Sequence, residues 1–206
     1  MRLLGKTVIF LWVLTGVSAV HAGVSAYDLV KQTSDRMIEA LKNKGDEIHK
    51  DPGLIYELVD EIILPHFDFE RMSQLVLGKY WLRISAEERE KFAKEFQSLL
   101  VRTYANAMSD YANQEIIFLP FRNDANSEDV SVKTEVNQQS GFPIPIDYSL
   151  YMKQGEWKVY DVAIDDVSLV VNYRTSFAAE IKQAGVAELI KKLQSRNRQA
   201  QNPAGE

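Results

Sequence analysis

The chain of 206 residues contains no cysteine, and this absence excludes several kinds of protein. Without thiols there is no disulfide scaffold, no cysteine nucleophile and no thiolate metal site. The sequence also lacks a basic excess, because 24 lysine and arginine residues face 29 acidic residues, for a formal charge of −5. A nucleic-acid-binding protein needs a positive surface to neutralise phosphates, so the charge argues against this class.

An uncharged segment near the N-terminus, residues 7–20, is only 14 residues long. At 1.5 Å per helical residue it is too short to cross a hydrocarbon core of about 30 Å. It follows Arg2 and Lys6 and ends in small residues up to Ala22, which is typical of a secretory signal peptide cleaved after Ala22. We therefore expect residues 1–22 to be removed.

The expected mature chain is more acidic than the full sequence. Removal of Arg2 and Lys6 leaves 22 basic and 29 acidic residues, a formal charge of −7. No cysteine follows the cleavage site, so a lipid-anchored lipoprotein is excluded. In a bacterium with two membranes, the mature protein is expected to be soluble and periplasmic.

Catalytic and metal-binding motifs are missing as well. The mature chain has two histidines, His49 and His66, neither with a ligand partner at metal spacing. There is no Gly-x-Ser-x-Gly elbow, no glycine-rich phosphate loop and no His-Glu-x-x-His. We expect no cofactor and no metal.

Asp161 is the one acid that deserves comparison with a catalytic group. It alternates with Trp157 and Val159 on an expected strand, so it can point into an apolar interior. A buried carboxylate with a raised pKa can act as a general base. A structural hydrogen-bond acceptor is the favoured interpretation, and catalysis by Asp161 is the alternative.

What the sequence does contain is a globular mixture, with 46% hydrophobic and 26% charged residues. Apolar residues recur on one helical face across residues 26–43, and a second such pattern runs from an N-cap at Asp51 and a first-turn Pro52 to Pro65. A third helix is expected at 69–77. These patterns predict a helical N-terminal region.

The strongest local signal is the capping box Ser85 to Glu88. Behind it, apolar residues repeat at steps of three and four as far as Tyr111. A helix of about 25 residues spans roughly 37 Å. Such a helix runs the length of a small domain.

After Tyr111 the hydrophobic pattern repeats every two residues, as in strands with one face exposed to solvent. The expected strands are 115–121, 130–137, 144–153 and 157–164. A short turn at Gln154 and Gly155 predicts that the last two form an antiparallel hairpin. Asp165 or Asp166 is expected to cap a helix over about 167–183, followed by a final amphipathic segment over 186–194.

This order of elements predicts an α+β fold. The N-terminal helices and the long helix pack on a curved, mainly antiparallel four-stranded sheet, and C-terminal helices close the domain. We expect a single domain over 23–195 and a flexible polar tail over 196–206. A curved sheet over helices encloses a hollow, which is the first functional clue.

Large apolar residues cluster where such a hollow would lie, and they can form either a pocket or an ordinary packed core. The sequence alone does not decide between the two. The candidates for a pocket lining are Leu75, Val76, Leu77, Tyr80 and Trp81 before the long helix, Phe96, Leu100, Tyr104 and Met108 along it, Ile146, Tyr148, Leu150 and Val159 on strands, and Val171.

Five motifs resemble, in order and at family spacing, the MlaC or toluene-tolerance family of periplasmic phospholipid-binding proteins. One departure is Asp166, where the family is expected to carry glycine, so the geometry of that turn is open. The motifs are 63–69 (ILPHFDF), 75–81 (LVLGKYW), 85–89 (SAEER), 157–162 (WKVYDV) and 167–174 (VSLVVNYR).

This resemblance implies an NTF2-like fold whose deep apolar pocket takes the acyl tails of a glycerophospholipid. It implies a non-enzymatic, monomeric carrier between an outer-membrane lipoprotein–porin complex and an inner-membrane ABC transporter with an MCE-domain protein. Such a carrier helps to maintain lipid asymmetry in the outer membrane. The alternatives are an NTF2-like enzyme that uses Asp161 as a base on a small hydrophobic substrate, and an interaction module with a filled core.

Overall fold

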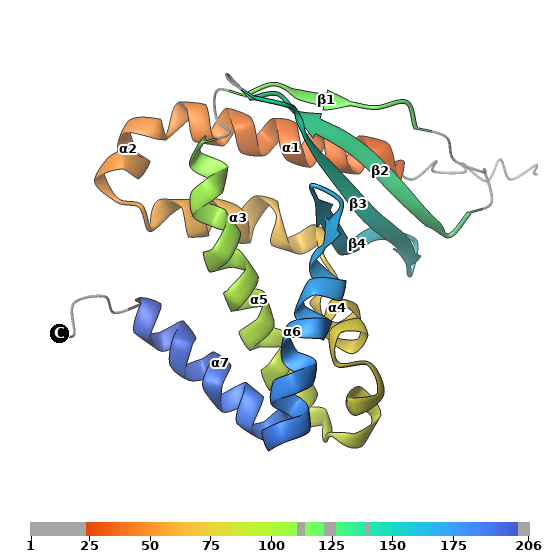
Figure 1. Ribbon diagram of the computed structural model, residues 1–206. Helices are drawn as coiled ribbons and strands as arrows, with labels where there is room; N and C mark the ends of the chain where they lie inside the picture. The colour runs from red at the N-terminus through yellow and green to blue at the C-terminus, as the bar shows by residue number, and fades with distance from the viewer. Residues whose placement is uncertain (1–23, 111–113, 122–126, 139–140, 202–206) are drawn as a thin grey trace, which may run out of the picture.

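The computed structural model describes residues 24–110, 114–121, 127–138 and 141–201. The expected signal peptide and Tyr111 lie outside these ranges. The described chain is α+β, with a five-stranded antiparallel sheet beside a layer of helices (Figure 1). The fold class expected from the sequence is confirmed.

The first half of the chain is helical. Ser25 caps the first helix, accepting a hydrogen bond from the Asp28 backbone N–H at 3.0 Å. The elements are α1 (Ala26–Asn43), α2 (Gly45–Lys50), α3 (Leu54–Ile62), η1 (Leu64–His66), α4 (Phe69–Leu77), η2 (Gly78–Arg83) and α5 (Ala86–Asp110).

The helix expected after Asp51 begins later than the sequence indicated. The Asp51 carboxylate accepts from the Gly53 N–H at 2.9 Å and so stabilises a turn. Gly53 is the N-cap of α3. The capping box before α5 forms as expected, because the Glu88 N–H donates to Ser85 Oγ at 3.2 Å and the Ser85 N–H donates to Glu88 at 2.9 Å.

The second half holds the sheet and two closing helices. The strands form an antiparallel meander in sequence order, β1-β2-β3-β4-β5, with one strand more than the four expected. The extra strand, β5, has only two residues, so it is too short to show the apolar–polar alternation that predicts a strand. The elements are β1 (Ile116–Phe118), β2 (Asp129–Val136), β3 (Ile144–Lys153), β4 (Glu156–Ile164), β5 (Val167–Ser168), α6 (Leu169–Ala184) and α7 (Val186–Gln201).

The expectation that Asp165 or Asp166 caps α6 is wrong. Both residues have positive φ, 51° and 62°, and they reverse the chain between β4 and β5. The cap is Ser168, whose Oγ accepts from the Val171 N–H at 3.1 Å. A left-handed φ favours glycine, and aspartate tolerates it better than most residues, which explains how Asp166 occupies this turn.

Helix α7 extends to Gln201, so residues 196–201 are not a flexible tail. Asn197 is only 4% exposed, and its side-chain amide donates to the Glu95 carboxylate at 2.5 Å and carbonyl at 3.0 Å. Arg102 donates to the Asn197 side chain at 2.5 Å. Polar residues in this stretch therefore bind α5, which a solvent-exposed interpretation of the sequence missed. Residues 202–206 lie outside the described chain.

Two hydrophobic clusters hold the fold, and α5 belongs to both. Phe92 and Phe96, each 0% exposed, pack with residues of the sheet, α4, α6 and α7. Ala105, also fully buried, packs with residues of α1, α2 and α3. Figure 1 shows α5 running from α1 and α3 down to α6 and α7. The two cores are therefore joined through one helix.

Asp68 fixes the start of α4 to the β3–β4 hairpin. Its Oδ1 accepts from the Arg71 N–H at 3.0 Å, and its Oδ2 accepts from Lys153 Nζ at 2.7 Å and from the Tyr151 hydroxyl. Its own N–H donates to the Val159 carbonyl at 2.9 Å. Burial raises the pKa of Asp68, but these hydrogen bonds outweigh burial and hold the pKa below 3.8. The folded state therefore favours the ionised carboxylate.

Replacement of Asp68 by asparagine is expected to lower the free energy of unfolding at pH 7 by about 2–3 kcal/mol, since charge-assisted hydrogen bonds are lost. The folded-state pKa is depressed, so the Asp68 contribution is complete above 3.8 and is lost as pH falls through the lower folded value. Urea denaturation of both proteins from pH 7 to pH 2 measures the difference, which should shrink below about pH 4. Asp60→Asn, an exposed change on α3, is the control; an equal loss in both variants would contradict the role of Asp68.

Candidate functional site

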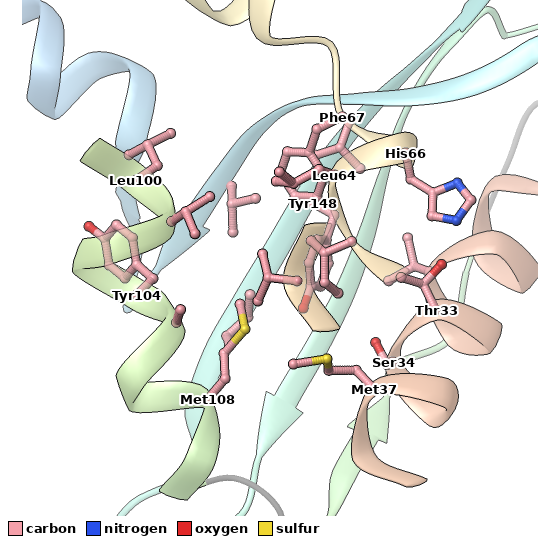
Figure 2. A pocket seen from close by; sticks show the side chains of 18 of the residues that line it. Thr33, Ser34, Met37, Leu64, His66, Phe67, Leu100, Tyr104, Met108 and Tyr148 are labelled. Atoms are coloured by element: carbon pink, nitrogen blue, oxygen red, sulfur yellow. The ribbon is translucent and has the colours of Figure 1, made fainter. Parts of the chain in front are cut away.

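A cavity of about 230 Å³ lies between the helices and the sheet (Figure 2). Its walls come from α1, α3, η1, α4 and α5 on one side and from the strands β1 to β4 on the other. One water needs roughly 10–15 Å³ of such space, and packed interiors rarely contain larger voids. The alternative of a filled core is therefore wrong for this part of the molecule.

Six of the residues expected to line a pocket do line this cavity. The α5 residues form one wall (Figure 2). The strand residues form the wall opposite the helices. The six are Leu100, Tyr104, Met108, Ile146, Tyr148 and Val159.

The other eight expected residues lie elsewhere. Five are buried in the cluster that α5 shares with the sheet, α4, α6 and α7: Val76, Leu77, Trp81, Phe96 and Leu150. Leu75 and Tyr80 are half-buried at the border of that cluster. Val171 is 54% exposed on the surface of α6. Helical spacing located apolar faces but not which part of each face meets the cavity.

None of the α1 residues that line the cavity was expected from the sequence to do so. Val30, Met37, Ile38 and Leu41 all line the cavity, together with Thr33 and Ser34. The four apolar residues fall on the stripe that predicts α1, so a signal was present. It did not reveal that the stripe faces a hollow.

The segment that follows α3 supplies a further wall. Ile63, Leu64, His66, Phe67 and Phe69 line the cavity. The Phe67 and Phe69 rings stack with centroids 5.8 Å apart. This wall coincides with the motif 63–69, which therefore contributes to the site itself.

Asp161 faces away from the cavity because β4 contains a bulge. Leu150 is opposite Val159 and Ser149 is opposite Asp161, which leaves Tyr160 as the extra residue. One extra residue reverses the alternation of faces. Val162 consequently lines the cavity and Asp161 does not.

The Asp161 carboxylate is a structural acceptor, as the favoured interpretation predicted. Oδ1 accepts from the Val162 N–H at 2.9 Å and from the Val170 N–H at 3.0 Å, and Oδ2 accepts from the Ser168 hydroxyl. These bonds join β4 to the start of α6. A general base would need a free oxygen facing substrate, and this geometry provides none.

The cavity lining contains few polar groups. They are Thr33, Ser34, His66, Tyr104 and Tyr148. Burial lowers the pKa of His66, and the positive charges of Lys158 and Arg36 lower it further, so the ring is neutral at pH 7. Within the described ranges, no group of three or more histidine or acidic residues is placed to hold a metal ion.

Within the same ranges, none of the helices has the length and apolar character needed to span a membrane. The cavity brings apolar side chains of the helices and of the sheet together around one space. An α+β domain with such a cavity defines a class, that of proteins that bind an apolar ligand in their interior.

The chain belongs to the MlaC family, because the MlaC protein family matches residues 31–195. It is 30% identical over 176 residues to the intermembrane phospholipid transport system binding protein MlaC of Haemophilus influenzae, covering 84% of this chain and 82% of that protein. It is 27% identical over 165 residues to the toluene tolerance protein ttg2D of Pseudomonas putida, covering 80% and 76%.

A solved structure supports the same relationship. The phospholipid-binding protein of Ralstonia solanacearum, in complex with a phospholipid, matches with a TM-score of 0.78 and 35% sequence identity. The match covers 85% of this chain and 98% of that chain. The resemblance stated from the five sequence motifs is confirmed.

Substitutions at two α5 residues, one in the packed core and one at the cavity, should differ in their effect on the free energy of unfolding. Phe96→Ala leaves a new void in a packed core and should lower the free energy of unfolding by about 3–5 kcal/mol. Met108→Ala borders existing space and should cost about 1 kcal/mol or less. Urea denaturation of lipid-free protein measures both. Losses of equal size would show that Met108 lies in a packed interior.

Proposed function

We propose that this protein is a periplasmic carrier of glycerophospholipid that holds the acyl tails in its cavity. The observation that best supports this proposal is the cavity of about 230 Å³, which has an almost wholly apolar lining in a chain of the MlaC family. The relative from Ralstonia solanacearum, described as phospholipid-binding, supports the choice of ligand. We assign no catalytic residue and no cofactor.

The physical need for such a carrier follows from the ligand. Each methylene withdrawn from water contributes roughly 0.8 kcal/mol, so two tails of about 15 carbons contribute more than 20 kcal/mol. A free phospholipid therefore leaves a bilayer too rarely to cross an aqueous compartment alone. An apolar cavity replaces the bilayer during transit and needs neither nucleotide nor catalysis.

The partners we propose are an outer-membrane lipoprotein–porin complex and the MCE-domain protein of an inner-membrane ABC transporter. The protein shuttles between them as a monomer and helps to maintain outer-membrane lipid asymmetry. The Haemophilus influenzae relative is named as the binding protein of an intermembrane transport system, which supports this role. Site-specific cross-linking in cells should capture both complexes; capture of neither would contradict the shuttle.

Introducing a charge into the cavity wall tests whether the acyl tails bind there. Val101 is half-buried on α5 and lines the cavity, so water can solvate Val101→Asp in the empty protein but not beside acyl tails. We expect bound phospholipid, measured by mass spectrometry after solvent extraction, to fall about tenfold or more.

The matched control is Val171→Asp, on the exposed surface of α6. It adds the same charge outside the cavity and should leave phospholipid occupancy unchanged. Circular dichroism checks that both variants fold. Full occupancy in folded Val101→Asp would contradict the assignment of the tails to this cavity.

A further inference from the structure

The polar groups of the cavity lining are not evenly distributed. Figure 2 shows Thr33, Ser34 and His66 on the side formed by α1 and η1, opposite Tyr104 and Met108 of α5. All three are half-buried, so they lie between the apolar interior and solvent. An amphipathic ligand would place its polar end at such an edge.

The hydroxyls of Thr33 and Ser34 are available to a ligand. Elsewhere on helices, the hydroxyls of Thr103, Thr175 and Ser176 donate to the carbonyl one turn earlier, at 2.7–3.0 Å. Thr33 and Ser34 make no side-chain hydrogen bond to any residue in the described ranges. Two donors therefore remain unused at the cavity edge.

Positive charge accompanies these donors. Arg36 follows Thr33 by three residues on α1, which places both on one helix face. Arg36 is exposed and forms no ion pair with another described residue. Lys158 reaches the same region, because its Nζ donates to the Pro65 carbonyl at 3.0 Å while it pairs with Glu156 at 2.9 Å.

His66 lies within the field of both cations. Arg36 and Lys158 each lower its pKa, after the larger effect of burial, whereas Glu156 acts in the opposite direction. A neutral imidazole still donates one N–H. The edge thus combines hydroxyl and imidazole donors with the charge of Arg36, which is not neutralised by an acid in the described structure.

We infer that Thr33, Ser34, Arg36 and His66 bind the phosphate group of the cargo phospholipid. This inference rests on the proposed function and adds the orientation of the lipid. The phosphodiester lies at the α1–η1 edge, and the tails run toward α5 and the sheet. Every glycerophospholipid carries this phosphate, so the edge orients the cargo without selecting among head groups beyond it.

Competition between two lipids with identical tails tests the inference. Lipid-free protein is offered an equal mixture of dipalmitoylphosphatidylcholine and dipalmitoylglycerol, which lacks the phosphate, and bound lipid is measured by mass spectrometry. Charge-assisted hydrogen bonds should favour the phospholipid by about tenfold. In Thr33→Val with Arg36→Gln the preference should fall about threefold or more, because two of the four phosphate-binding groups are lost.

The control variant combines Thr175→Val with Lys42→Gln. It removes one hydroxyl and one positive charge from exposed helix positions, and it should keep the preference. Equal uptake of the two lipids by the wild-type protein overturns this inference alone. Uptake of neither lipid overturns the proposed function and this inference together.

A second readout distinguishes a lipid phosphate from free phosphate. An NMR titration should show that the His66 pKa is higher in protein loaded with phosphatidylcholine than with dipalmitoylglycerol, because an opposite charge favours the imidazolium. Lys158, Arg36 and Glu156 face His66 in both states, so their effects cancel. Millimolar inorganic phosphate should not reproduce the shift; if it does, the edge is a site for free anions and the inference is overturned.

Discussion

An apolar cavity persists only if its walls are held apart, because apolar side chains without neighbours lose dispersion contacts and are drawn together. Helix α5 supplies this constraint. Its first half is fixed in one packed core through Phe92 and Phe96, and its second half is fixed in another through Ala105. Leu100 and Tyr104 lie between Phe96 and Ala105 along the helix, and together with Ala105 they line the cavity.

The remaining walls depend on polar anchors. Asp68 ties the η1–α4 segment to the β3–β4 hairpin, and Asp161 ties β4 to α6. Asn197 holds α7 against α5. All three use buried or half-buried polar groups. Asp68 and Asn197 bind residues from distant parts of the chain, whereas Asp161 binds Ser168 and Val170, which follow it closely. Asp68 and Asp161 therefore fix segments that border the cavity, and Asn197 acts on the cavity through α5.

Local patterns predicted the helices α1, α4 and α5 and the strands β2 to β4, because hydrophobic period and caps depend on neighbouring residues. Tertiary features escaped prediction. Phe96 and Leu100 share a helical stripe and one buried cluster, yet only Leu100 also lines the cavity. The bulge at Tyr160 reverses the face on which Asp161 lies, and the sequence around Tyr160 does not indicate a bulge. Asn197 looked solvent-exposed because its partners, Glu95 and Arg102, are about a hundred residues away.

If the protein carries phospholipid in this cavity, the acyl chains lie in the space between α1, α5 and the sheet. Crystals of protein loaded with a phospholipid brominated midway along its tails would locate the chains by anomalous diffraction. We expect bromine peaks within the cavity, between Met37 of α1 and Leu100 of α5. Bromine peaks confined to the outer surface, with only water in the cavity, would contradict it.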